Sequence, residues 1–158
     1  MAKYDIEEGQ YSVRGCRFAI VAAKFNGAIV DKLVDGALDT LARHQVGAEA
    51  IDVIRVPGAF ELALAAQRVA QSNKVDAILT LGAVIRGGTP HFEYVCTEAA
   101  RGAMNVGLEQ NIPVIFGVLT TDDLEQALER AGGAEGNKGA EAAIAALEMV
   151  SLLRELGS

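Results

Sequence analysis

Short apolar runs alternate along this chain with longer segments whose apolar residues have the spacing of a helix, and this alternation restricts the folds that the chain can adopt. The apolar runs cover residues 17–23, 49–56, 76–83 and 113–119. Short, mainly apolar runs are typical of parallel strands whose two faces are both covered. Between and after these runs, apolar residues recur three and four positions apart, which predicts amphipathic helices.

The order of these segments, strand and helix four times over with one further helix at the end, predicts a single α/β domain over residues 1–158. Parallel strands joined in this way need right-handed crossovers, which place helices on both faces of the sheet. We therefore expect a flavodoxin-like three-layer sandwich around a four-stranded parallel sheet. The first dozen residues are a candidate extra edge strand, in this subunit or in a neighbour. Asn26 and Asp122 are candidate N-caps of the first and fourth helices.

The chain carries a formal net charge of −7. A nucleic acid needs a basic surface for its phosphates, so this balance argues against DNA or RNA as a partner. A small anionic substrate remains compatible with it, provided that a few local cations hold the anion. No apolar run is long enough to cross a membrane, and the acidic first ten residues do not resemble a secretory signal. We therefore expect a cytoplasmic protein that does not bind a membrane.

Cysteine usage gives no sign of a metal site. Cys16 and Cys96 are the two cysteines of the chain, too few and too far apart for zinc. Their spacing does not exclude a disulfide, but the expected compartment is reducing. We interpret both as buried small apolar residues and expect no zinc site.

Unusual residues gather where the predicted strands end. In an open α/β sheet, ligands bind beyond the carboxyl ends of the strands. This rule selects residues 24–27, 57–61, 82–91 and 120–122. The third of these segments holds a pair of glycines, a threonine and a histidine, and it is the richest candidate for a binding loop.

Two interpretations of the third segment remain open. Gly87, Gly88 and Thr89 either present backbone N–H groups and a hydroxyl to an anion or simply turn the chain. His91 either transfers protons near neutral pH or makes a structural hydrogen bond at a helix start. The residue types alone do not decide between these alternatives.

The other segments offer similar pairs of alternatives. Phe25 is either a core residue or a platform for a flat ring. Glu61 is either a carboxylate favoured by a helix N-terminus or an acceptor for substrate hydroxyls. Arg130 and Lys138 flank a glycine-rich stretch and are either solvated or the local cations that an acidic protein needs to hold a phosphate.

These segments carry a resemblance to a known family. They read FN at 25–26, VPGAFELALAA at 56–66, GAVIRGGTPHFEYV at 82–95, FGVLTT at 116–121, and ERAGG with GNKGAEAA between 129 and 143. In this order and at this spacing they resemble lumazine synthase over nearly the whole chain. The long string from Gly82 to Val95 is the most specific part.

The resemblance implies a role for each candidate in the pyrimidine pocket. Phe25 stacks on the pyrimidine ring, Glu61 accepts hydrogen bonds from ribityl hydroxyls, and His91 transfers protons. The remaining lining residues are Asn26, Ala59, Phe60, Ala83, Val84 and Ile85.

The resemblance also implies how a phosphate is held. Gly88 and Thr89 cradle it, and Arg130 binds it as well. Three further residues complete the implied site: Phe116 from the adjacent subunit, Lys138, and Glu141, which orients Arg130. The sequence departs from the common family pattern at Ala134 and Glu135, where many members have a lysine and a small residue.

The implied reaction joins two small-molecule substrates, a ribitylaminouracil and a four-carbon sugar phosphate, without a cofactor. The implied assembly is a homo-pentamer, with a 60-subunit icosahedral shell as a further expectation and riboflavin synthase as a partner. Two other classes stand beside this one: a lumazine- or flavin-binding module without catalysis, and a shell protein whose main role is assembly. His91 and Arg130 argue against a pure binder, which needs no proton relay.

Overall fold

The computed structural model describes residues 2–157 and confirms the α/β architecture. Its main sheet contains β1 (Phe18–Ala23), β2 (Ile51–Val56), β3 (Ala77–Ile85) and β4 (Val114–Thr121). The strands pair in parallel in the order β2-β1-β3-β4. This order agrees with a flavodoxin-like sandwich. β3 and β4 each extend two residues beyond the predicted ends, because their ladder continues to the pair Ile85 and Thr121.

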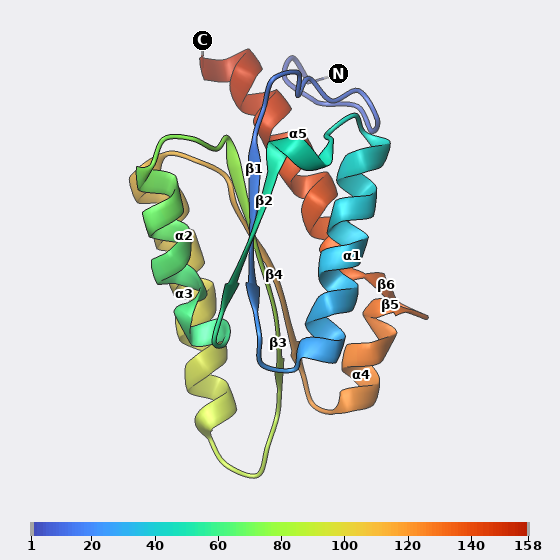
Figure 1. Cartoon of the computed structure of the whole chain (residues 1–158), viewed down its shortest axis with the longest axis vertical. Coiled ribbons are helices and arrows are strands. Elements are labelled where there is room, and N and C mark those ends of the chain that lie inside the picture. The colour runs from blue at the N-terminus through green and yellow to red at the C-terminus, as the bar shows by residue number, and fades with distance from the viewer. Residues whose placement is uncertain (1, 158) are drawn as a thin grey trace.

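Helices cover both faces of this sheet (Figure 1). On one face lie α2 (Leu62–Gln71) and α3 (His91–Gln110). On the other lie α1 (Gly27–Arg43), α4 (Leu124–Glu129) and α5 (Lys138–Gly157). Two short 3-10 helices, Ala48–Ala50 and Ala59–Glu61, precede β2 and α2.

Strand β1 shows how the sheet separates two hydrophobic cores. Successive side chains of a strand point to opposite faces. Phe18 and Ile20 accordingly belong to the core beneath α1 and α5, whereas Ala19 and Val21 belong to the core beneath α2 and α3. All four are fully buried. The central strand is therefore apolar throughout, as its sequence predicts.

Helices α1 and α5 approach each other closely at Gly139. A Cβ atom at Gly139 would overlap the backbone carbonyl of Leu33, so only glycine fits there. Beside it, Asn137 Nδ2 donates to the Lys32 carbonyl at 3.0 Å, and Asn137 Oδ1 accepts from the Ala140 N–H at 3.0 Å. The GNKG segment thus caps α5 and fastens it to α1.

Three details differ from the sequence-based expectations. Residues 2–16 contain no strand in this chain, so an added edge strand remains a prediction only for a neighbouring subunit. The segment after α4 forms a small antiparallel pair, β5 (Ala131–Gly133) and β6 (Gly136–Asn137), which was not predicted. The cap of α4 is Asp123 rather than Asp122, since the Asp123 carboxylate accepts from the Gln126 N–H at 2.8 Å.

Within residues 2–157, no helix is both long and apolar enough to span a membrane. The same residues contain no group of three or more His, Cys, Asp or Glu side chains placed to hold a metal ion. Cys16 and Cys96 are free thiols, and burial raises the pKa of each above its ordinary value.

Candidate active site

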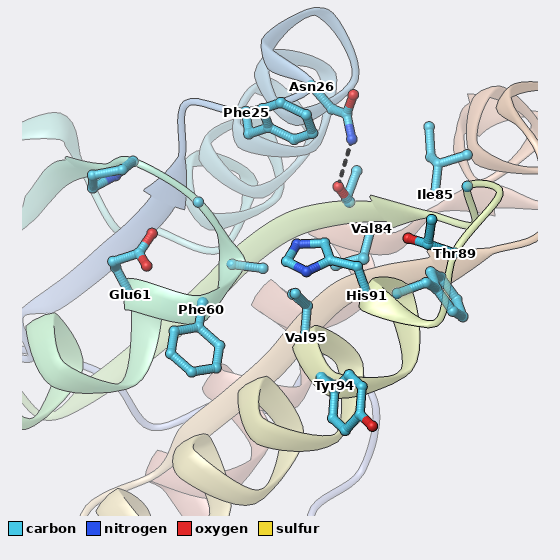
Figure 2. Close-up of a pocket in the computed structure, with 16 residues that line it drawn as sticks. Phe25, Asn26, Phe60, Glu61, Val84, Ile85, Thr89, His91, Tyr94 and Val95 are labelled. Atoms are coloured by element: carbon cyan, nitrogen blue, oxygen red, sulfur yellow. Dashed lines mark hydrogen bonds between the residues drawn. The ribbon is translucent and has the colours of Figure 1, made fainter.

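A cavity of about 640 Å³ opens beyond the carboxyl ends of β1, β2 and β3 (Figure 2). This volume is ordinary for a small-molecule site. All nine predicted pyrimidine-pocket residues line it, together with Thr89 from the predicted phosphate loop: Phe25, Asn26, Ala59, Phe60, Glu61, Ala83, Val84, Ile85 and His91. The rule that places ligands at this edge of the sheet therefore located a cavity correctly.

The loop after β1 is fixed by two neighbouring strand ends. The Lys24 and Phe25 N–H groups donate to the carbonyls of Val56 and Pro57 at 2.7 and 3.0 Å. Asn26 has a left-handed backbone (φ 56°), and its side-chain amide donates to the Ala83 carbonyl at 2.8 Å. Asn26 therefore precedes α1 as expected, but its side chain joins this loop to strand β3 and does not cap the helix.

Phe25 and Phe60 present aromatic surface to solvent. Phe25 is 71% exposed and Phe60 is 58% exposed, although both are large and apolar. A core role for Phe25 is thereby excluded in this chain. Exposed rings beside a cavity are suited to stacking against a flat ligand.

Glu61 is the last residue of the short 3-10 helix that leads into α2. Its N–H donates to the Gly58 carbonyl at 3.2 Å, which closes the turn after β2. No side-chain hydrogen bond or ion pair of Glu61 is present among the described residues. Its carboxylate is therefore available as an acceptor on the cavity wall (Figure 2).

His91 is the first residue of α3, and its imidazole is directed into the cavity (Figure 2). The chain enters the helix through Pro90, whose carbonyl accepts from the Glu93 N–H at 3.0 Å. The imidazole makes no hydrogen bond to the described residues, so a structural hydrogen bond does not explain it. The other histidine, His44, packs edge-on against Tyr11 far from this loop in sequence.

The backbone conformation and the surrounding atoms do not require glycine at positions 87 and 88. Neither has a positive φ, and a Cβ atom on either would meet no atom within 4 Å. The Gly87 and Gly88 N–H groups donate no hydrogen bond to the described residues, so they are open to a ligand. Gly87 and Thr89 line the cavity, while Gly88 lies between them without lining it.

The cationic candidates lie around a second cavity of about 320 Å³. Arg130, Lys138 and Glu141 line it together with Glu135 and the end of β4. Arg130 Nη1 donates to the Gln126 carbonyl at 3.0 Å and lies 3.7 Å from the Glu129 carboxylate. Glu141 makes no ion pair or hydrogen bond with Arg130 among the described residues, so a role of Glu141 in orienting Arg130 stays a prediction.

The two cavities have different chemistry. The residues around the larger one include aromatic rings, Glu61 and His91 but no lysine or arginine. Arg130 and Lys138 belong to the smaller one. Phe116 lines neither cavity and lies half-buried on the edge strand β4.

Sequence reasoning missed part of the larger cavity. Phe92, Tyr94 and Val95 line it from the start of α3. Pro57 and Gly58 also line it, and they belong to the predicted segment 57–61 but had no role assigned. Phe92 and Val95 fit the apolar stripe of α3, which predicts core positions. A helix that begins at a cavity exposes its first turn to that cavity, and the position of Tyr94 off the stripe was the available signal.

Comparison with known proteins assigns this arrangement to a family. A family model described as 6,7-dimethyl-8-ribityllumazine synthase matches residues 15–154. A protein of Halorhodospira halophila named 6,7-dimethyl-8-ribityllumazine synthase is 55% identical over 152 residues, which cover 96% of this chain and 97% of the relative. The chain belongs to the lumazine synthase family.

Membership of the lumazine synthase family accounts for the sequence strings that line the larger cavity. The strings after β2 and β3, VPGAFELALAA and GAVIRGGTPHFEYV, supply most of its walls. The ERAGG and GNKG strings of this lumazine synthase family member instead surround the smaller cavity. One chain therefore presents the family motifs on two separate surfaces.

Proposed function

We propose that the chain catalyses the lumazine synthase reaction, the penultimate step of riboflavin biosynthesis. The substrates are 5-amino-6-(D-ribitylamino)uracil and 3,4-dihydroxy-2-butanone 4-phosphate, and the products are 6,7-dimethyl-8-ribityllumazine, phosphate and water. The observation that carries the proposal is a cavity that combines an exposed Phe25, an unpaired Glu61 carboxylate and an inward-directed His91. A flat ring, a polyol chain and a proton relay require this set of groups.

The chemistry consists of additions and eliminations that move protons. The pyrimidine amine attacks the ketone carbon, and loss of water gives an imine. Phosphate then leaves, the chain tautomerises, and the second amine closes the ring with loss of another water. His91 removes and returns protons at these steps, since an imidazole exchanges protons near neutral pH. Holding two reactants in register supplies the remaining acceleration, roughly 7–11 kcal/mol at best.

The proposal places the phosphate against the 87–89 loop and against Arg130. The Gly87 and Gly88 N–H groups support the first contact, because they donate to no atom of the described residues and are open to an anion. The second contact needs a cation, and the larger cavity has no lysine or arginine of its own. We infer that Arg130, Lys138, Glu141 and Phe116 reach this cavity from a neighbouring subunit.

A site shared in this way requires an oligomer with a closed arrangement. In a closed ring, the larger cavity of each subunit can face the smaller cavity of the next subunit, so that every site is complete. A homo-pentamer and a 60-subunit shell built from pentamers are the assemblies that we propose. A cytoplasmic location and riboflavin synthase as a partner, which would consume the lumazine product, complete the proposal.

One assay tests the activity directly. Purified protein is mixed with both substrates, and lumazine absorbance and released inorganic phosphate are followed together. We expect one phosphate per lumazine, with unchanged rates in the presence of a metal chelator. Tight binding of lumazine without turnover would overturn the proposal and favour a binding module.

A further inference from the structure

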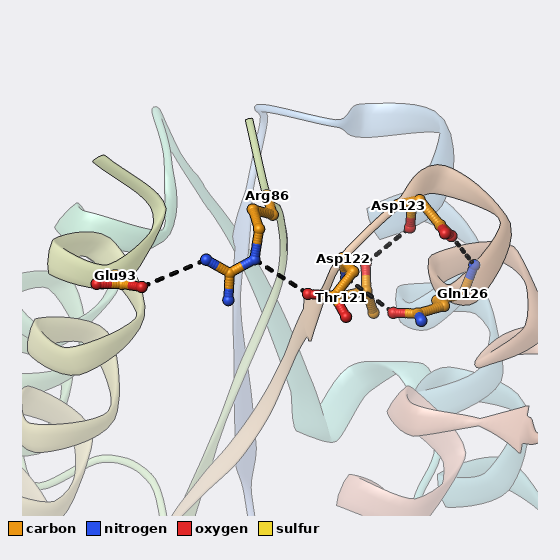
Figure 3. Close-up of polar contacts among 6 residues, drawn as sticks. All are labelled: Arg86, Glu93, Thr121, Asp122, Asp123 and Gln126. Atoms are coloured by element: carbon orange, nitrogen blue, oxygen red, sulfur yellow. Dashed lines mark hydrogen bonds and ion pairs between the residues drawn. The ribbon is translucent and has the colours of Figure 1, made fainter. Parts of the chain in front are cut away.

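Arg86 lies between the loop of the larger cavity and the turn after β4 (Figure 3). Its guanidinium contacts carboxylates from two segments: Nη1 lies 3.3 Å from Glu93 Oε1, and Nε lies 3.0 Å from Asp122 Oδ1. These hydrogen bonds raise the pKa of Arg86, with Asp122 contributing most. The Arg86 N–H also donates to the Thr121 carbonyl at 2.8 Å, which extends the pairing of β3 with β4.

The contact with Glu93 closes the loop that carries Gly87, Gly88 and Thr89. Arg86 precedes this loop and Glu93 lies in the first turn of α3, so the ion pair joins the two ends. The guanidinium also lies 4.4 Å from the centre of the Phe92 ring, and Phe92 is only 9% exposed. A partly buried ring gives the arginine a fixed surface to stack on.

The contact with Asp122 continues toward the smaller cavity. The Asp122 N–H donates to Gln126 Oε1 at 2.8 Å, and the Gln126 carbonyl accepts from Arg130 Nη1 at 3.0 Å. The turn is held further by Thr121 Oγ1, which donates to the Asp123 carbonyl at 2.9 Å. A continuous set of polar contacts therefore runs from Glu93 through Arg86 to Arg130.

Two carboxylates around one guanidinium also argue against direct binding of the phosphate by Arg86. With Glu93 and Asp122 both in contact, the local formal charge is negative, so Arg86 is a poor binding group for a phosphate. Isolated exposed ion pairs contribute little to stability. A shared arginine that joins three segments acts instead on the freedom of the glycine-containing loop, which is costly to order.

We propose that Arg86 is a positioning residue, which holds the loop bearing Thr89 and His91 in its binding arrangement by clamping it between Glu93 and Asp122. This inference rests on the proposed role of that loop in binding the sugar phosphate. Phe25 and Glu61, on the pyrimidine side, make none of these contacts. Arg86 should therefore affect the two substrates unequally.

The test compares Arg86→Gln and Arg86→Lys with a matched ion pair on α3, the helix that carries Glu93. Glu98 and Arg101 form an exposed ion pair of 2.6 Å on α3 outside the larger cavity, so Glu98→Gln and Arg101→Gln are the controls. We expect Arg86→Gln to raise KM for the sugar phosphate about three- to tenfold and to leave KM for the pyrimidine unchanged. Arg86→Lys retains the charge but not the planar guanidinium that contacts two carboxylates, so its KM for the sugar phosphate should lie between those of the wild type and Arg86→Gln.

Two further readouts separate positioning from general damage. Amide hydrogen exchange of residues 87–91 should be faster in Arg86→Gln and unchanged in both controls, and it can be measured whether or not the protein makes lumazine. Adding Glu93→Gln to Arg86→Gln should cause no further loss, since both remove the same contact. Unchanged exchange in the loop, or a fall in kcat with both KM values unchanged, would overturn the inference. Failure of the wild type to make lumazine would instead count against the proposed function.

Discussion

The side chain of Asn26 donates a 2.8 Å hydrogen bond to the backbone carbonyl of Ala83, 57 positions further along the chain. This bond joins the loop that carries Phe25 to the strand end that forms the cavity floor. The backbone of Asn26 is left-handed at φ 56°, so the residue serves the loop in two ways.

The two contributions of Asn26 can be separated by substitution. Asn26→Gly removes the hydrogen bond but tolerates the backbone, so we expect a loss of about 1 kcal/mol in the free energy of unfolding. Asn26→Ala should lose roughly 1–2 kcal/mol more, because alanine is strained in this conformation. Urea unfolding at a fixed protein concentration measures both. Asn73 is the control: it has φ 57° and no side-chain hydrogen bond, so Asn73→Gly should be near neutral.

Gly139→Ala should disrupt the packing of α5 on α1. The added Cβ would overlap the Leu33 carbonyl, and backbone on both sides leaves little room to adjust. We expect a loss of about 1–3 kcal/mol or more, seen as a lower urea midpoint with an unchanged slope. Gly157→Ala, in the same helix with no atom within 4 Å of the new Cβ, should not lower the midpoint. Equal midpoints for the two variants would contradict this interpretation of the contact.

His91→Ala should lower turnover by about 10²–10⁴-fold, the usual contribution of a general acid–base group. Stability should change little, because His91 is exposed and makes no hydrogen bond to the described residues. Steady-state rates between about pH 6 and 8, the range in which a histidine titrates, are the measurement. His44→Ala provides the matched control, and its rate should equal that of the wild type. Wild-type turnover by His91→Ala throughout this range would remove the catalytic assignment.

Gly88→Ala should separate stability from function. No atom lies near the added Cβ and φ is not positive, so the substitution should be neutral or stabilise the protein by up to about 1 kcal/mol. The methyl group nevertheless crowds the N–H groups that we assign to the phosphate, so KM for the sugar phosphate should rise. Gly27→Ala, at an equally open position outside the larger cavity, should leave that KM unchanged. A loss of stability without a change in KM would show that Gly88 only shapes the chain.

Mixing two inactive variants tests whether a site spans two subunits. His91→Ala and Arg130→Ala are unfolded together, refolded as a mixture and assayed. If the histidine and the arginine of each site come from neighbouring subunits, about a quarter of the sites in a random mixture regain both. Activity should then return to about a quarter of the wild-type value, and light scattering should report a pentamer or a multiple of one. No recovery, or a fully active monomer, would exclude the shared site.

The fold was predictable because each strand and helix has a regular pattern of its own. The apolar run that became β1 and the three-four spacing of α3 depend only on local sequence. The small pair β5 and β6 had no such signal: five residues of glycine-rich chain are held by tertiary contacts such as that of Asn137 with Lys32. Residue patterns in short segments do not encode contacts of this kind.

The candidate site was predictable to the extent that strand ends identify it. Phe25, Glu61 and His91 follow three different strands and meet at one cavity, as the sheet topology requires. The clamp at Arg86 was not predicted, because Glu93 and Asp122 lie 7 and 36 positions away and their approach depends on the paired ends of β3 and β4. The division of the cations from the rings into two cavities likewise emerged only in three dimensions.

The close packing of Gly139 on Leu33 has a consequence for the folding of the protein during its synthesis on the ribosome. The core beneath α1 and α5 draws residues from both ends of the sequence, from Val13 to Val150. A nascent chain that has reached residue 137 already holds all four strands of the main sheet, but one face of them lacks α5. That apolar face is open to chaperones and to other nascent chains until the last twenty-residue helix leaves the exit tunnel. We therefore expect the core beneath α1 and α5 to close only after α5 has been synthesised.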